Sequence, residues 1–195
     1  MTSAYKDVAM IGGPNGAGKT TTATTMLPKE LDIREFVNAD EIARGLSPFN
    51  PEGSARAAGR LMIQRIHELI SRGESFAFET TCSGRAHAQT LLRCQKAGYR
   101  LTLIFLWLPS AKEALMRVAR RVSQSGHRIP KDVVIRRYAA GLKNLQRLYL
   151  PIADIAYIYD NTDEGGILIA ERQPGRALVV CDDRRWRRIL RANRD

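Results

Sequence analysis

The stretch that decides the fold of this chain is Gly13-Pro14-Asn15-Gly16-Ala17-Gly18-Lys19-Thr20. It matches the pattern G-x-x-x-x-G-K-[ST], whose glycines let the backbone curl until several N–H groups point at one anion. The apolar run 8–11 before it predicts a strand, and a helix is expected from Lys19 to Met26, ended by Pro28. The start of that helix adds its positive dipole end. The stretch therefore predicts a strand, a phosphate-binding loop and a helix.

The loop also predicts which phosphates and which cation are bound. The Lys19 ammonium would bridge the outer phosphates of a nucleoside triphosphate, which we take to be ATP. The Thr20 hydroxyl would hold Mg²⁺, a cation that prefers hard oxygen ligands. The residues expected to bind the nucleotide are Gly13, Pro14, Asn15, Gly16, Ala17, Gly18, Lys19, Thr20 and Thr21.

Short apolar runs alternate with longer amphipathic ones along the rest of the chain, which is typical of βαβ units and a parallel sheet. The strongest run, 101–108, is almost continuously apolar and fits a central strand covered on both faces. We predict an α/β, three-layer P-loop NTPase/kinase fold with a mainly parallel five-stranded sheet. Weaker runs at 167–170 and 177–180 predict a hairpin at the edge. The expected parallel strands are 8–11, 36–37, 76–78, 101–108 and 155–159.

Length and composition indicate an ordinary globular chain. Its 195 residues predict a single domain over 1–195, with 44% hydrophobic and 26% charged residues. No apolar run approaches the roughly 18 residues that span a bilayer, and the polar N-terminus lacks the shape of a signal peptide. Three scattered cysteines, Cys82, Cys94 and Cys181, form no metal pattern and suggest a reducing compartment. We therefore expect a cytoplasmic protein with no membrane partner.

The net charge of +11 predicts a basic surface that suits nucleotides or nucleic acids. Six arginines crowd positions 184–194, within an expected basic C-terminal helix at about 183–194. An apolar stripe would dock this helix on the fold and leave its arginines in solvent, whereas contact with a nucleic acid is the alternative. The stripe consists of Trp186, Ile189, Leu190 and Asn193.

Three classes of nucleotide-binding protein fit a phosphate loop. A transporter-type ATPase would add a Ser-Gly-Gly segment and an apolar strand ending in paired acids, and a GTP switch would add Asn-Lys-x-Asp. The sequence has none of these. A small kinase needs a general base near the acceptor hydroxyl and cations on a mobile lid, both of which the sequence offers.

The candidate base is Asp40, which follows a short strand and would lie at the ligand-binding edge of the sheet. A helix-capping aspartate is the alternative. Glu79, Thr80 and Thr81 end the third strand at the same edge and could orient a polar acceptor, or form a solvated loop. His67 and His87 are expected at the surface.

The candidate lid covers about 120–137, in an arginine-rich stretch that begins near Arg117. Guanidinium groups that close over a transferring phosphoryl group would stabilise its charge and exclude water. Solvated helix arginines are the alternative. The basic residues of the stretch are Arg117, Arg120, Arg121, His127, Arg128, Arg136 and Arg137.

Taken together, these residues make the chain resemble the zeta toxin family of P-loop kinases from about Asp7 to Asn161. The resemblance rests on the loop followed by a further threonine and on four other motifs. These are Asn38-Ala39-Asp40, Phe78-Glu79-Thr80-Thr81, Gly126-His127-Arg128-Ile129-Pro130 and Tyr159-Asp160-Asn161. It implies ATP- and Mg²⁺-dependent phosphorylation of the 3′-hydroxyl of the amino sugar in UDP-N-acetylglucosamine, and an antitoxin that blocks the ATP site.

The resemblance also assigns roles. It implies that Asp40 is the catalytic aspartate, Thr20 the magnesium-binding hydroxyl, and Glu79 and Thr81 substrate-binding residues. The two lid arginines fall on Arg120 and Arg128, although the first could slip to Arg121. Two positions depart from the family, because Ser83 stands where the toxins carry an arginine and Ile63 stands near a substrate-side glutamate. We expect a kinase whose small-molecule acceptor is a UDP-amino sugar, with another small alcohol, a polynucleotide end or a non-catalytic ATP-binding role as alternatives.

Overall fold

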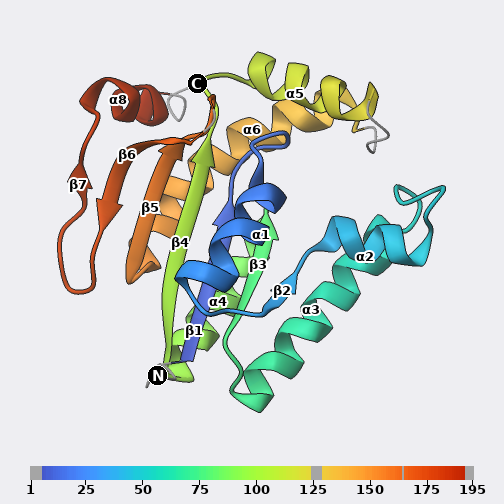
Figure 1. Ribbon diagram of the computed structural model, residues 1–195, viewed down its shortest axis with the longest axis horizontal. Coiled ribbons are helices and arrows are strands. Elements are labelled where there is room, and N and C mark those ends of the chain that lie inside the picture. Colours follow the sequence, from blue (N-terminus) through green and yellow to red (C-terminus); the bar gives the residue numbers. More distant parts are fainter. Residues whose placement is uncertain (1–5, 124–128, 164, 192–195) are drawn as a thin grey trace.

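The computed structural model describes residues 6–123, 129–163 and 165–191. Helices alternate with strands along most of the chain, and Figure 1 shows them around one twisted sheet. The strands are β1 Lys6–Gly12, β2 Glu35–Val37, β3 Phe76–Thr80, β4 Tyr99–Trp107, β5 Ile155–Asp160, β6 Ile167–Arg172 and β7 Val179–Val180. The helices are α1 Lys19–Glu30, α2 Ala39–Leu46, α3 Ala55–Arg72, α4 Ala86–Lys96, α5 Ala111–Ser123, α6 Lys131–Asn144, the π-helical turn η1 Leu145–Tyr149, α7 Leu150–Ile152 and α8 Asp183–Arg191.

The sheet has seven strands in the order β2-β3-β1-β4-β5-β6-β7. The first five are parallel, which confirms the expected α/β fold with a mostly parallel sheet. The expected count of five strands was wrong for the sheet as a whole. β6 runs antiparallel against β5, and β7 against β6, so the hairpin extends the same sheet. Pairing with β5 satisfies backbone groups that an edge strand would leave open.

Alternating side chains on β1 explain why helices cover both faces. Ala9 and Ile11 point to one face, where they pack with Leu27 of α1. Val8 and Met10 point to the other face, which α3, α4 and the α6–η1 segment cover. A strand with buried residues on both faces reads as a continuous apolar run, as the sequence of β1 does. Figure 1 places α1 in front of the sheet and α4 and α6 behind it.

Helix α1 does not end at Pro28 but continues to Glu30. A proline removes one intrahelical hydrogen bond and crowds the preceding turn, yet here only two residues follow it in the helix. Leu27 is fully buried, and its carbonyl accepts the N–H of Ile33 in the next segment. Tertiary packing therefore holds a last turn that local propensity disfavours.

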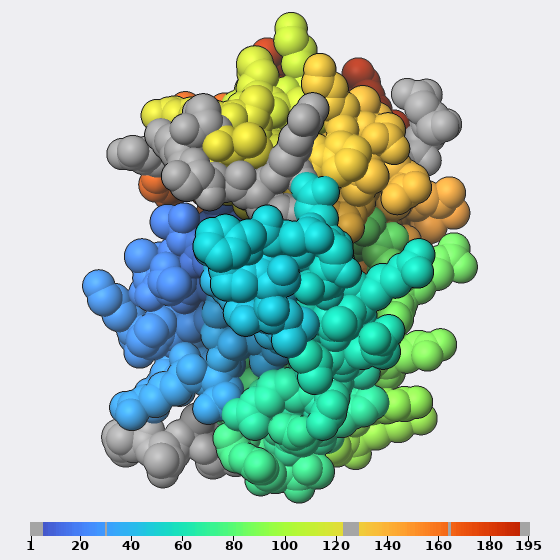
Figure 2. Space-filling model, turned by 90° about the vertical axis from the view of Figure 1, so that its right-hand side faces the viewer, coloured from blue at the N-terminus to red at the C-terminus, as the bar shows by residue number. Residues whose placement is uncertain are grey.

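The parallel register brings the functional segments to one edge of the sheet. Gly12 at the end of β1 lies beside Thr80 at the end of β3, and Val37 at the end of β2 lies beside Phe78. Ligands of open parallel sheets bind outside these carboxyl ends. Figure 2 shows α2 and α3, in light blue to blue-green, below the yellow and orange α5 and α6. Among the described residues, none of the helices combines the length and apolarity of a transmembrane segment.

Candidate functional site

The glycine-rich loop forms an anion cradle at the start of α1. Gly18 caps the helix in the left-handed conformation, at φ 81°, which a side chain would strain. The Ala17 N–H closes a turn on the Pro14 carbonyl at 3.2 Å. No side chain caps the helix, so the backbone N–H groups of its first turn remain for a ligand. The geometry fits the phosphate binding that the motif predicts.

Lys19 lies almost entirely buried beneath this cradle. Its ammonium group donates to the Pro14 carbonyl at 3.0 Å and lies 3.5 Å from one carboxylate oxygen of Glu79. A buried ammonium needs such partners, because burial alone would disfavour its charge. These contacts fix the Lys19 side chain toward the loop interior, in the place where a phosphate group would meet it.

Glu79 joins the loop to the neighbouring strands. Its second carboxylate oxygen accepts the Thr20 hydroxyl at 2.7 Å and the Asn38 amide at 3.0 Å. The Thr20 hydroxyl donates to Glu79 and accepts one long hydrogen bond, at 3.5 Å, from the Asn38 amide, so its oxygen keeps a lone pair for a cation. Oxygen donors with an adjacent carboxylate fit Mg²⁺. The sequence placed Glu79 on the acceptor side, whereas these contacts put its carboxylate against the loop itself.

Asp40 lies two residues beyond Asn38, in the first turn of α2. The helix is capped by Asn38, whose side-chain oxygen accepts the Asp40 N–H at 2.8 Å. Asp40 is therefore not the capping residue. Its side chain is exposed, and its carboxylate has no hydrogen bond or ion pair with the described residues. This arrangement leaves the carboxylate available to a ligand, and its role as general base stays a prediction.

A short loop at residues 81–84 continues from β3 beside these groups. The hydroxyls of Thr81 and Ser83 lie 2.9 Å apart in a hydrogen bond, and Thr80 accepts the N–H of Cys82. The Asn144 amide donates to the carbonyls of Cys82 and Ser83 at 2.8 and 3.0 Å. We call residues 81–84 the acceptor loop. Its shape depends on Asn144, at the point where α6 passes into the π-helical turn η1.

Two further contacts bring α6 and η1 close to the acceptor loop. The Tyr149 hydroxyl donates to the Gly84 carbonyl at 2.5 Å. A Cβ atom at Gly141 would come within 2.6 Å of the Thr81 carbonyl oxygen, so only glycine permits this approach. The loop therefore packs against backbone as well as side chains.

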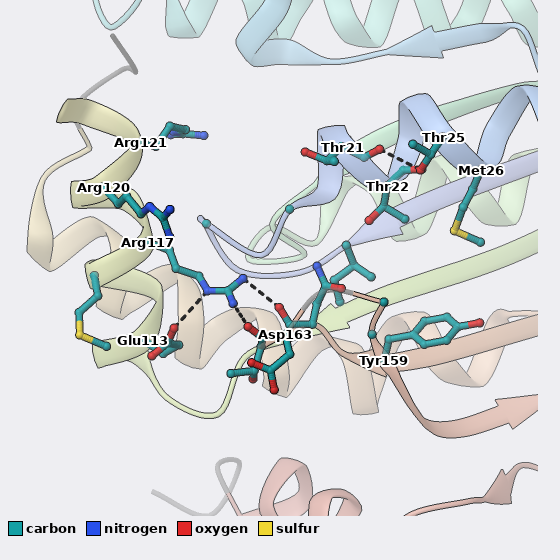
Figure 3. A pocket seen from close by; sticks show the side chains of 18 residues that line it. Thr21, Thr22, Thr25, Met26, Glu113, Arg117, Arg120, Arg121, Tyr159 and Asp163 are labelled. Atoms are coloured by element: carbon teal, nitrogen blue, oxygen red, sulfur yellow. Dashed lines mark hydrogen bonds and ion pairs between the residues drawn. The ribbon is translucent and has the colours of Figure 1, made fainter. Parts of the chain in front are cut away.

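A cavity of about 1290 Å³ opens on the other side of the phosphate loop. Figure 3 shows Thr21, Thr22, Thr25 and Met26 of α1 facing the α5 helix across it. The third side is closed by Tyr159 near the end of β5 and by residues that follow this strand, among them Asp163 (Figure 3). The cavity adjoins Gly16 and Gly18, so it continues directly from the phosphate cradle. Its place and size suit a nucleoside attached to bound phosphates.

The arginines of α5 divide into two groups. Arg117 donates to the carbonyls of Asn161 and Thr162 and pairs with Glu113, so it clamps the segment after β5 (Figure 3). Arg120 and Arg121 line the cavity. Arg128, the second predicted lid arginine, lies outside the described residues, as does most of the predicted polar lid segment. The structure thus brings Arg120 to the nucleotide side of the site.

The profile of the Zeta toxin family matches residues 1–172. This chain belongs to the Zeta toxin family. The match covers the phosphate loop, Asp40, Glu79 and the segment after β5. It stops before α8, which lies at Asp183–Arg191.

Other proteins share part of this sequence or share its fold. An uncharacterized protein of Haemophilus influenzae is 29% identical over 126 residues, which cover 65% of this chain and 88% of that protein. The AvrRxo1-ORF1:AvrRxo1-ORF2 structure with sulphate ions matches with a TM-score of 0.78 at 17% identity, covering 96% of this chain and 64% of that chain. The same pair with ATP matches with a TM-score of 0.76. The PezAT toxin-antitoxin structure from Streptococcus pneumoniae gives 0.65 at 15% identity, covering 88% and 73%. This chain therefore spans less than two thirds of the AvrRxo1 chain.

Three asparagines make contacts at the site that the sequence did not predict. Asn38 contacts Glu79, Asn144 holds the acceptor loop, and the Asn161 amide donates to the Ala17 carbonyl at 2.7 Å. Asn38 and Asn161 stood within motifs that were noticed. Asn144 had no sequence signal, because its partners are about 60 residues away along the chain. Asn15, within the phosphate loop, is buried with its side-chain oxygen unpartnered.

Burial shifts the pKa values of two titratable groups near the site. Burial raises the pKa of the Cys82 thiol to about 12, with a smaller opposing effect from Lys19, so this cysteine is an inert packing residue. Cys82, Cys94 and Cys181 are all free. Burial lowers the pKa of His87, whose ring lies 5.1 Å from the Phe78 ring. The expected surface position of His87 was wrong, because the start of α4 packs back onto β3.

Proposed function

We propose that this chain is an ATP- and Mg²⁺-dependent phosphotransferase that acts on the hydroxyl group of a small molecule. The observation that carries the proposal is the cluster of Lys19, Thr20, Asn38 and Glu79, held together where the phosphate loop meets the ends of β2 and β3. Asp40 stands next to this cluster, and its carboxylate makes no hydrogen bond or ion pair within the described part of the chain. The neighbour that has been solved with ATP is consistent with the choice of nucleotide.

The residues have separate tasks in the proposed reaction. Lys19 and the loop N–H groups hold the outer phosphates, and Thr20 with Glu79 supplies the oxygen environment for the cation. A cation held beside Thr20 and Glu79 would supply positive charge against the transferring group. Asp40 accepts the proton of the acceptor hydroxyl, whose oxygen attacks the terminal phosphorus while the bond to the bridging oxygen breaks and ADP leaves. Arg120, and Arg128 beyond the described residues, complete the charge stabilisation.

We further propose a UDP-amino sugar, such as UDP-N-acetylglucosamine, as the acceptor. The support is membership of the Zeta toxin family and the polar acceptor loop with its Thr81 and Ser83 hydroxyls. Ser83 and Ile63 replace two charged groups of the family pattern and weaken this finer assignment relative to phosphoryl transfer itself. A polynucleotide end remains the alternative, since the chain carries a net charge of +11.

The test is to incubate the protein with labelled ATP, Mg²⁺ and separate panels of UDP-sugars, small alcohols and oligonucleotides. Mass spectrometry would identify the molecule that gains a phosphate. Phosphorylated UDP-N-acetylglucosamine supports the full proposal. Phosphorylation of oligonucleotide ends at physiological salt, with the sugar untouched, would reject the sugar but keep the kinase. Hydrolysis or binding of ATP without any phosphorylated acceptor would reject the phosphotransferase.

The proposal also concerns organisation and partners. We propose a single kinase domain over 1–195 in the cytoplasm, with the lid at about 120–137 closing on the nucleotide side. Because PezAT is a toxin-antitoxin system, we propose an antitoxin protein as a partner. Induced expression in bacteria should then arrest growth, whereas the Lys19→Ala variant should not. Equal growth of both strains would argue against a toxin.

A further inference from the structure

The C-terminal helix α8 lies outside the part of the chain that the family profile matches, yet it reaches the nucleotide side of the site. The match ends at residue 172, and α8 spans Asp183–Arg191. Its Arg185 guanidinium donates through Nε to a carboxylate oxygen of Asp160 at 2.8 Å. Asp160 is the last residue of β5, immediately before the segment that lines the cavity. The helix is therefore joined to the nucleotide cavity through one ion pair.

Asp160 organises the segment that follows it. Its other carboxylate oxygen accepts both the backbone N–H of Thr162, at 3.0 Å, and the Thr162 hydroxyl. The Asp160 side chain is only 7% exposed, so its charge requires a nearby cation. Arg185 supplies that cation. Without Arg185, a buried carboxylate would be left with two neutral donors, and hydration of that carboxylate would compete with its bonds to Thr162.

The same segment is held from its opposite side by the α5 helix. Arg117 donates to the carbonyls of Asn161 and Thr162, while the Asn161 amide contacts the phosphate loop. The segment is thus fixed between two guanidinium groups. One, Arg117, belongs to the matched family region and binds carbonyls. The other, Arg185, pairs with Asp160, whose carboxylate accepts the backbone N–H of Thr162.

Independent contacts fix the position of α8 itself. Ile189 is completely buried, and its carbonyl accepts the Gln146 amide at 2.9 Å. Arg188 lies over the Trp107 ring, 5.2 Å from its centroid, and donates to the Pro109 carbonyl. Trp107 in turn accepts the Asn161 N–H through its carbonyl. The helix therefore braces the ends of β4 and β5 together.

We propose that α8 is a positioning element for the nucleotide, acting through Arg185 and Asp160 on segment 161–163. This inference rests on the proposed ATP site and assigns a task to a helix outside the family match. Arginine suits the task because its planar fork binds two acids at once, here Asp160 and Asp182. A lysine could satisfy only part of this arrangement.

The test compares Arg185→Ala with Arg187→Ala in the full-length protein. Arg187 is the matched control, because it also pairs with an aspartate on α8, but both groups are exposed and face no part of the cavity lining. Calorimetry with ATP and Mg²⁺ should show an affinity loss of about tenfold for Arg185→Ala, the size expected for one charge-assisted contact. Arg187→Ala should stay within about twofold of wild type. Arg185→Lys should fall between them.

Hydrogen exchange provides a readout that needs no nucleotide. The Thr162 N–H should exchange faster in Arg185→Ala than in wild type or Arg187→Ala, because its acceptor Asp160 would be loosened. If Arg185→Ala does not fold, the pair Asp160→Asn with Arg185→Gln keeps the hydrogen bonds without the charges. That pair should bind ATP more tightly than Asp160→Asn alone.

The outcomes separate this inference from the proposed function. Unchanged ATP affinity and unchanged Thr162 exchange in Arg185→Ala would overturn the positioning role and leave the kinase proposal standing, even if the melting temperature fell. No gain of the paired variant over Asp160→Asn would have the same consequence. A wild-type protein that binds no ATP would overturn both proposals.

Discussion

The nucleotide side and the acceptor side of this site are built in different ways. On the nucleotide side, consecutive residues of one loop form the cradle, and the start of α1 carries no side-chain cap, which leaves its backbone N–H groups for a ligand. On the acceptor side, Asp40 comes from α2, the acceptor loop follows β3, and Asn144 at the end of α6 donates to carbonyls of that loop. The first half depends on local conformation and the second on packing between distant elements. We therefore expect the two halves to respond separately to substitution.

The largest effect should come from removing the buried lysine of the nucleotide side. Lys19→Ala should weaken ATP binding by about a hundredfold or more and abolish transfer, because the variant would lose the ammonium proposed to bind charged phosphate oxygens. Calorimetry with ATP and Mg²⁺ would measure this. Lys29→Ala, an exposed lysine in the last turn of the same helix, is the control. Unchanged affinity in Lys19→Ala would remove the basis of the nucleotide site.

Asp40→Asn should slow phosphoryl transfer without changing ATP binding. Loss of the general base should reduce the transfer rate by about a hundredfold, with ATP affinity unchanged. Glu41→Gln is a close control, because Glu41 shares the first turn of α2 and so the same interaction with the helix dipole. A transfer rate near that of wild type in Asp40→Asn would reject Asp40 as the general base and leave it only a place in the first turn of α2.

A third substitution probes the support of the acceptor loop. Asn144→Ala should raise KM for the phosphorylated acceptor by about tenfold, while ATP affinity stays near wild type, because the loop loses bonds to three carbonyls. Gln95→Ala removes a similar amide-to-carbonyl bond, to Ile152, away from the site. Both variants should lose stability, and only the first should change KM. A parallel rise in KM with Gln95→Ala would contradict a specific role for Asn144.

The smallest expected effect concerns His87, whose ring packs against Phe78 of β3. Burial lowers its pKa below the ordinary 6.5, so the unfolded chain binds a proton more readily than the folded one. Stability is then fully present above this ordinary pKa and falls as pH drops from about 6.5 through the folded pKa. His87→Gln should lose less stability than wild type between about pH 7 and pH 5 in urea titrations. The exposed His67→Gln should behave like wild type; equal slopes in all three proteins would argue against the burial effect.

The hairpin and Pro28 show where sequence reasoning about the fold reached its limit. The weak runs 167–170 and 177–180 were recognised as an edge hairpin. The sequence did not indicate that the hairpin pairs with β5 and so extends the main sheet. Similarly, Pro28 led us to end α1 too early, because the packing of Leu27 outweighed the preference of proline to end a helix. The alternation of strands and helices, which reflects burial on both sheet faces, was sufficient for the parallel core.

The residues alone were enough to predict the phosphate loop with its strand and helix, because eight consecutive residues carry that conformation in their own backbone preferences. It also placed Asp40 and Glu79 at the ends of strands, since parallel strands end at a common edge. Packing between distant elements sets the contacts of Glu79 with Lys19 and Thr20, of Asn144 with the acceptor loop, and of Arg185 with Asp160. These contacts join residues between 25 and about 60 positions apart. A side chain's partner at such separation is set by how elements pack, which no local pattern of residues specifies.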